Sequence, residues 1–394
     1  MGKFKNFLLR TFELSCRLLP FKKKAVLFKS FNGQYNDNPK YISIKLHEID
    51  PKIKQYWIIG NRCHEIKYLP SYIKKVKTDS FRSSYIKARC SIVVDNGAGW
   101  YLSYSTNRHR FYSFLKDKKQ FNLSTWHGTP FKKIGADSLE NNGWEKENLF
   151  TTSDCLICGS SFISSAFNSA FCGKTNNLLI GTPRNDYLFH YGDATVKINL
   201  RHKLELPLDK KIVLFAPTYR NNVEDSGLRQ IEMFDINVLL TSFSSKFGGE
   251  WVIVFRSHNL VLDSLQKTSL LDNEVFFDGN IGDDMMEYML ASDAMITDYS
   301  GALFDICLTS MPCFLFAHDT ERYISLERGS YFKLSELPFR MNTSFKMLID
   351  SVLSFDFDKD IQNKELFLKH IGNVEDGKAS LNCSLIIQEK MNSK

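Results

Sequence analysis

Residues 124–130, Ser-Thr-Trp-His-Gly-Thr-Pro, place a histidine, a glycine and a proline at the end of an apolar run. Phe121 to Trp126 have the pattern of a short buried strand, and Pro130 suits the first position of a following helix. His127 therefore falls at the carboxyl end of a strand, the edge at which open α/β sheets bind ligands. An imidazole titrates near neutral pH and can accept a proton from an attacking hydroxyl. The alternative is a structural histidine, hydrogen-bonded at a strand end.

A second group of candidate residues lies in the run 294–305. A predicted strand ends there at Thr297, and Asp298, Ser300 and Gly301 follow it. We expect a helix to begin at these small residues. The free N–H groups and the dipole of a helix start, with a serine hydroxyl beside them, form a natural cradle for phosphate. The alternative is that Asp298 and Ser300 only cap the helix.

Three basic residues follow two other predicted strands in the same half of the chain. The strand at 212–216 leads to Arg220, and the strand at 251–255 leads to Arg256 and His258. A guanidinium group matches phosphate oxygens with a planar fork of donors. His258 can donate to a pyrophosphate or to the leaving group. Surface salt bridges for the arginines and a buried structural role for His258 are the alternatives.

The segment Gly-Thr-Pro-Arg-Asn-Asp, residues 181–186, follows the last predicted strand of the first half. Proline, asparagine and aspartate are common in turns, so a turn with a capped helix would explain the segment. Its position, where the chain leaves the first domain, also predicts a hinge that lines a cleft. Arg184, Asn185 and Asp186 are the candidate residues of this hinge.

Short apolar runs that end in Gly, Asp or His alternate with segments long enough for helices, which is typical of parallel βαβ units. They predict two Rossmann-like, doubly wound parallel sheets with a ligand-binding cleft between their carboxyl edges. The expected domains are residues 25–190 and 191–345, followed by a helical segment at 346–394. The predicted strands lie near 25–31, 56–60, 73–77, 91–95, 121–126, 155–158, 178–181, 212–216, 251–256, 275–277, 294–297 and 313–316.

Residues 1–24 contain seven basic side chains and one acidic one, so they carry +6 of the formal net charge of +7. The rest of the chain is nearly neutral and lacks the basic excess of a duplex-binding surface, so we expect no nucleic-acid partner. Phenylalanines and leucines recur at near-helical spacing among these basic side chains. This pattern predicts an amphipathic helix that lies on an anionic membrane. Packing of the helix on the protein's own body is the alternative.

Several other classes of protein are disfavoured. No stretch approaches the roughly 18 apolar residues that span a bilayer, and no secretory signal is recognisable. Nine cysteines without a framework spacing are typical of a reducing cytosol. Cys155 and Cys158 form a Cys-x-x-Cys in an apolar run, but a strand there points the two thiols to opposite faces. We therefore expect no metal site at this pair.

Six segments together resemble the CDP-glycerol glycerophosphotransferase family of teichoic acid and related capsule polymer synthesis. They occur in the family's order, at 126–130, 181–186, 216–220, 256–258, 297–300 and 328–329. The resemblance implies a glycosyltransferase-B-type fold. It also implies transfer of a polyol phosphate, foremost glycerol phosphate, from a CDP-activated donor to a lipid-linked or growing polymer, with release of CMP. It implies a peripheral location on the cytoplasmic face of the membrane and no tightly bound cofactor.

Carried over position by position, His127 matches the proposed catalytic base, and His258 matches the second histidine near the donor phosphates. The chain departs from the family pattern at Gly301, where a serine is frequent, at Asn259 and at Thr182. These departures leave donor and acceptor preference open. We expect the donor phosphates and nucleotide near Arg220, Arg256, Thr297, Asp298, Ser300 and Gly301, and the cleft to be lined by Gly128, Thr129, Pro130, Arg184, Asn185, Asp186 and Arg328.

Two other functions remain as alternatives. A sugar transferase of the same fold would use a nucleotide sugar, and a non-catalytic subunit of an envelope polymer assembly complex would keep the fold without turnover. The motifs do not separate a priming enzyme from a polymerase, or teichoic acid from capsule. They also leave open the polyol, the oligomeric state and any need for a divalent cation.

Overall fold

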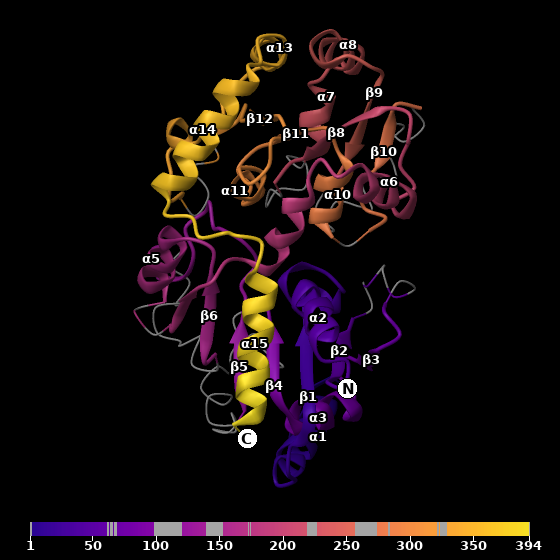
Figure 1. Ribbon diagram of the computed structural model, residues 1–394, viewed down its shortest axis with the longest axis vertical. Coiled ribbons are helices and arrows are strands. Elements are labelled where there is room, and N and C mark those ends of the chain that lie inside the picture. The colour runs from indigo at the N-terminus through magenta and orange to yellow at the C-terminus, as the bar shows by residue number, and fades with distance from the viewer. Residues whose placement is uncertain are drawn as a thin grey trace.

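Two parallel β-sheets organise the chain in the computed structural model, with the second sheet and its helices above the first in Figure 1. The structure describes residues 2–60, 63, 66, 69–97, 120–138, 153–171, 173, 175–218, 227–256, 274–282, 284–320, 323 and 329–393. The prediction of an α/β fold with two doubly wound parallel sheets is confirmed.

The first sheet has the strand order β3-β2-β1-β4-β5-β6-β7. Its strands are β1 (Lys22–Lys29), β2 (Lys54–Ile59), β3 (Ile73–Lys77), β4 (Cys90–Asp95), β5 (Phe121–Ser124), β6 (Cys155–Cys158) and β7 (Asn177–Leu179). Apolar residues of α2 (Asp37–Ile49) and α15 (Ala379–Asn392) cover one face. On the other face α3 (Phe81–Arg89) packs on the sheet, α1 (Gly2–Arg17) packs on α3, and α5 (Ser161–Ala170) packs on β6.

The second sheet has the order β10-β9-β8-β11-β12-β13. Its strands are β8 (Lys211–Ala216), β9 (Trp251–Phe255), β10 (Phe276–Asp278), β11 (Ala294–Thr297), β12 (Cys313–Phe316) and β13 (Met341–Asn342). One face is covered by α6 (Ala194–Lys203), α10 (Met285–Ala291), α11 (Ala302–Ile306) and α14 (Phe357–His370). The other is covered by α7 (Gly227–Glu232), α8 (Ile236–Phe247) and α13 (Phe345–Leu353).

The central strands are buried on both faces, which is why their sequences are apolar without alternation. Every residue of β4, β9 and β12 is buried. The short edge strand β13 contains one buried and one exposed residue, and the sequence pattern missed it. Short 3-10 helices lie at Phe31–Gly33 (η1), Gly135–Asp137 (η4), Pro183–His190 (η6) and Leu334–Glu336 (η9).

Pro130 does not begin a helix, and residues 131–134 are not helical, so that prediction is wrong. Lys132 instead forms an antiparallel bridge with Ser330 of the second half of the chain. Proline at a helix start is only a local preference, and pairing with the other domain determines the conformation here.

The C-terminal segment, predicted as one helical unit at 346–394, is divided between the two sheets. α13 and α14 pack on the second sheet, whereas α15 returns to the first and lies beside α2 (Figure 1). Cys383 and Ile387 of α15 are fully buried in the first core. Helical periodicity identifies the apolar face of a helix but not the sheet that this face covers.

The basic N-terminal segment contains α1 and the first residues of β1. Leu9 and Cys16 of α1 are buried, and the helix contacts α3. Its outer face presents Phe4 and Phe7, which are 69% and 63% exposed. Within the described residues, no helix has the length and apolarity to cross a bilayer.

Candidate active site

His127 follows β5 and is held between two aromatic rings. Its ring stacks on Trp126, with 4.3 Å between centroids, and lies edge-on to Phe31 at 4.6 Å. Trp126 has a φ of 51°, a left-handed conformation that is unusual for a bulky residue, and Gly128 has a φ of 107°. The chain therefore turns sharply on both sides of His127. Nδ1 of its imidazole lies 3.1 Å from the backbone oxygen of Asn96.

The surroundings of His127 favour a neutral imidazole. Burial lowers its pKa, and Arg184 lowers it further, whereas Asp37 and the hydrogen bond to Asn96 act in the opposite direction. A neutral ring that donates from Nδ1 to the Asn96 carbonyl keeps its lone pair on Nε2. Nε2 is then the atom that can accept a proton.

Arg184 joins His127 to residues from two other elements. Its Nη1 donates to the backbone oxygen of His127 at 2.8 Å and to Oδ1 of Asp37 at 3.1 Å. Its Nη2 donates to Oδ2 of Asp305 on α11 at 2.6 Å. Asn38 completes the arrangement, since its amide donates to the backbone oxygens of residues 125 and 126 and its oxygen accepts from the Arg184 N–H.

The loop after His127 touches the second domain directly. The Lys133 N–H donates to the Gly329 oxygen, and the Tyr331 N–H donates to the Phe131 oxygen, both at 3.0 Å. A Cβ placed on Gly301 would lie 2.7 Å from the backbone oxygen of Thr129. The histidine loop and the start of α11 are therefore in contact, as a site between two domains requires.

The predicted donor-side residues Thr297, at the end of β11, and Asp298, which follows it, make hydrogen bonds inside the protein. Asp298 is buried, and its carboxylate accepts from the Thr218 N–H at 2.7 Å and from the Gln230 amide at 3.1 Å. Thr297 donates to the Ala216 oxygen at 2.7 Å. Thr297 thus fixes the end of β8, and Asp298 fixes the chain that follows it.

Ser300 and Arg256 also have contacts within the protein. The Ser300 hydroxyl accepts from the N–H of Ala302, the first residue of α11, at 3.2 Å. Nη1 of Arg256 donates to the backbone oxygens of Gly279 and Gly282 at 2.6 and 3.0 Å, and the guanidinium lies over the Tyr288 ring. These contacts place Arg256 at the turn after β10. Arg220, His258 and Arg328 lie outside the described residues.

The residues predicted to form a hinge make contacts in two directions. Arg184 faces His127, whereas the Asn185 amide donates to Glu375 at 3.1 Å, and the Asp186 carboxylate accepts from the N–H groups of residues 379 and 380 at the start of α15. Glu375 also accepts from the Thr182 N–H at 2.8 Å, and its burial raises the pKa of this carboxyl to about 7. The segment 181–186 is therefore tied to the chain that returns from α14 to α15.

Sequence reasoning missed several residues around this site. Asp37, Asn96 and Asp305 gave no motif of their own, although Asn96 follows an apolar strand just as His127 does. A buried ion cluster between the domains was also missed. In it, Lys40 on α2 binds Asp284 at 2.8 Å and Glu287 at 2.6 Å.

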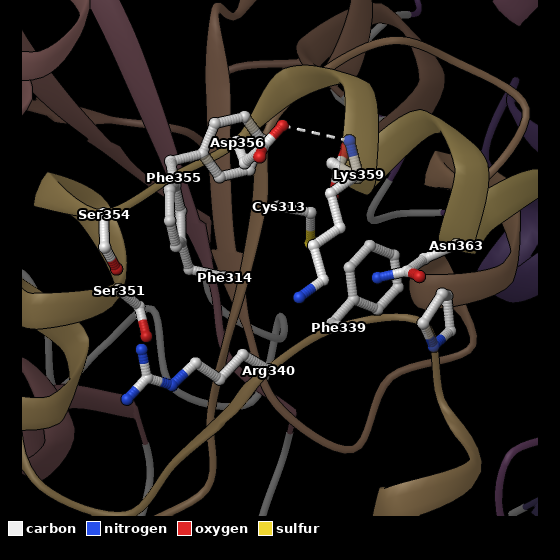
Figure 2. Close-up of a pocket in the computed structure, with 12 residues that line it drawn as sticks. Cys313, Phe314, Phe339, Arg340, Ser351, Ser354, Phe355, Asp356, Lys359 and Asn363 are labelled. Carbon is white, nitrogen blue, oxygen red and sulfur yellow. Dashed lines mark hydrogen bonds between the residues drawn. The ribbon is translucent and has the colours of Figure 1, made fainter.

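A separate pocket of about 290 Å³ lies in the second domain, at the amino end of β12. Figure 2 shows the Lys359 side chain pointing into it, with Phe339 and Asn363 on one side. None of the predicted site residues that the structure describes lines this pocket. The histidine loop approaches the second domain at the opposite, carboxyl edge of the sheet. It is therefore not part of the candidate active site.

The family model for CDP-glycerol:poly(glycerophosphate) glycerophosphotransferase matches residues 11–387 of the chain. The chain belongs to this glycerophosphotransferase family. A teichoic acid glycerol-phosphate transferase of Staphylococcus aureus is 28% identical over 390 residues, which is 94% of this chain and 94% of that protein. A teichoic acid poly(glycerol phosphate) polymerase of Bacillus subtilis is 30% identical over 325 residues, 80% of this chain. The match covers only 41% of that longer polymerase.

Solved structures agree with membership of the glycerophosphotransferase family. The wall teichoic acid polymerase TagF superposes with a TM-score of 0.79 at 27% identity, covering 99% of this chain and 94% of the other. The UDP-GlcNAc 2-epimerase of Methanocaldococcus jannaschii, at 14% identity and a TM-score of 0.50, shares the fold alone.

Proposed function

We propose that this protein transfers glycerol phosphate from CDP-glycerol to a hydroxyl group of a teichoic-acid-type polymer or its lipid-linked precursor. The observation that carries the proposal is the placement of His127, with Nδ1 bound to a carbonyl, at the contact between the two domains. The match to a Staphylococcus aureus glycerol-phosphate transferase, which covers 94% of each chain, supports the choice of polyol.

In the proposed reaction, Nε2 of His127 takes the proton of the acceptor hydroxyl, and the hydroxyl oxygen attacks the phosphorus that bears glycerol. A new P–O bond forms, the bond to the bridging oxygen breaks, and CMP leaves with the electron pair. The start of α11 and Arg256 would stabilise the negative charge that develops on the departing CMP. The family resemblance adds Arg220 and His258 to this role. Asp298 and Thr297 would act by holding the chain after β8 in place.

The test is CMP release from CDP-glycerol by the His127→Gln variant. Loss of a general base lowers turnover by about 10²- to 10⁴-fold, and we expect donor affinity to stay within a few-fold of wild type. His202→Gln, on the exposed side of α6, is the matched control. Equal CMP release by wild type and His127→Gln would overturn the assignment of the base.

The choice of donor needs its own comparison. CDP-glycerol, CDP-ribitol and common nucleotide sugars are each incubated with the protein and a membrane acceptor, and free nucleotide is measured. We expect release from CDP-glycerol. Release only from a nucleotide sugar would support a sugar transferase, and nucleotide binding without any release would support a non-catalytic subunit. The mass of the product then separates the addition of one unit from polymerisation.

We also propose that α1 attaches the protein to an anionic membrane. The inner side of the helix is occupied by α3, while Phe4 and Phe7 face outward among basic side chains. In co-sedimentation with phosphatidylglycerol vesicles, the double variant Phe4→Asp/Phe7→Asp should lose binding. Leu385→Asp, at a half-exposed position on α15, should not. Equal binding by both variants would contradict this proposal.

A further inference from the structure

Arg184 lies at the junction of the histidine loop, the start of α2 and helix α11. Its guanidinium donates hydrogen bonds to all three elements. Nη1 donates to His127 and Asp37, and Nη2 donates to Asp305. We propose that Arg184 and Asp37 are positioning residues that hold the imidazole of His127 and couple it to the donor-side helix α11. This inference rests on the proposed role of His127 as the base.

The contacts form a closed ring around His127. Arg184 holds the backbone oxygen of His127 and the carboxylate of Asp37. The same carboxylate accepts from the side-chain amide of Asn96, whose backbone oxygen lies 3.1 Å from Nδ1 of His127. The backbone and the ring of the histidine are thus fixed from one hub, and this hub also binds α11 through Asp305.

The local backbone is shaped to admit this guanidinium. Gly128 has a φ of 107°, and a Cβ at this position would lie 2.1 Å from Nη2 of Arg184. Asp37 has a φ of 58° at the start of α2, a conformation that aspartate tolerates better than most residues. A lysine cannot replace the arginine, because a single ammonium on a flexible stem lacks the planar fork that reaches three acceptors.

The charges of Arg184 and Asp37 also affect the pKa of His127. Arg184 lowers the pKa of His127 and Asp37 raises it, so the two opposite charges offset each other at the imidazole. Among the described residues, the imidazole also contacts the Asn96 carbonyl and the uncharged rings of Trp126 and Phe31. The pair therefore orients the base while leaving it neutral, as a proton acceptor must be.

The test compares Arg184→Gln and Asp37→Asn in CMP release from CDP-glycerol across pH 5 to 9. We expect kcat to fall about 10- to 100-fold in both variants, because misplacing a reacting group by about 1 Å costs on the order of 10²-fold. Donor affinity should change less than about threefold. The acidic limb of the pH profile should move to higher pH in Arg184→Gln, which loses a cation, and to lower pH in Asp37→Asn, which loses an anion.

Two further variants keep the test decisive. Arg184→Lys should restore the position of the acidic limb but not kcat. Arg201→Gln removes another buried arginine, one that binds the backbone oxygens of residues 207, 210 and 291, and should lower stability without moving the limb. Where turnover is too slow to measure, NMR titration of the His127 ring protons reports the same opposite shifts.

Three outcomes would overturn the inference: wild-type kcat in Arg184→Gln, an unmoved His127 pKa in both variants, or the same effects in Arg201→Gln. Measuring His127→Gln in parallel separates this result from a failure of the proposed function. If His127→Gln is inactive and Arg184→Gln is not, only the positioning role is wrong. If His127→Gln is active, the base itself is wrongly assigned.

Discussion

Gly301 offers a test of how closely the histidine loop fits the second domain. Its φ of −60° is helical, so Gly301→Ala introduces no backbone strain and tests the contact alone. The added Cβ would lie 2.7 Å from the backbone oxygen of Thr129. Because carbon–oxygen contacts settle at about 3.3 Å, the loop or α11 must retreat by roughly 0.6 Å.

This displacement falls two residues from His127, in a loop that is restrained at both ends. Arg184 holds the His127 oxygen, and Gly329 holds the Lys133 N–H. Since an error of about 1 Å can cost on the order of 10²-fold in rate, we expect about a tenfold loss of kcat. Overpacking of this kind also destabilises the fold by about 1–3 kcal/mol.

The assay is CMP release at saturating CDP-glycerol, with thermal unfolding measured on the same preparations. Gly248→Ala is the control, because its Cβ would enter open space and its φ of 71° makes the substitution strained. It should lose stability by about 1 kcal/mol and keep kcat. An unchanged kcat in folded Gly301→Ala, or an equal loss in Gly248→Ala, would refute the reasoning.

Two further predictions concern stability. Burial raises the pKa of Glu375 from 4.5 to about 7, so the native state holds a proton that the unfolded chain releases, and stability falls as pH rises between these values. Glu375→Gln should remove up to about 3 kcal/mol of this pH dependence. The check is the free energy of unfolding in urea at pH 5 and 8, and a variant that differs from wild type by the same amount at both pH values would contradict it. Lys40→Met leaves Asp284 and Glu287 without this cation and should cost about 3–5 kcal/mol. Lys45 is partly exposed, and Lys45→Met should cost less than about 1 kcal/mol. Similar losses for both lysines would contradict a special contribution of the buried cluster.

The sheets were predictable because parallel strands buried on both faces are continuous apolar runs. The strand expected at 212–216 is observed at Lys211–Ala216, and the one at 313–316 has the predicted bounds. His127 also lies just past the end of a strand of the first sheet, as expected. These features depend only on local composition, and the sequence displays that directly.

The residues that surround His127 were not predictable, because their proximity depends on the order of the strands in the sheet. The sheet places β1, β4 and β5 side by side. The segments that follow these strands contain Asp37, Asn96 and His127, so three residues spread over 90 positions meet at one edge. Local patterns cannot show which strands are neighbours. The same limit applies to Asp298, whose carboxylate is bound by partners that come from outside its own run.

Helix α15 returns from the second domain to the first sheet, so the first core includes residues that follow the second domain in the chain. Cys383 and Ile387 complete the core of the first sheet, while the chain that carries them comes directly from α14 on the second. Asp186 caps α15, and Glu375 binds the segment 182–185, so the two crossings between the domains are joined to each other. Two linked crossings restrain the relative positions of the domains more than a single linker would. Arg184 lies in one of these crossings and can therefore hold the histidine loop and α11 together.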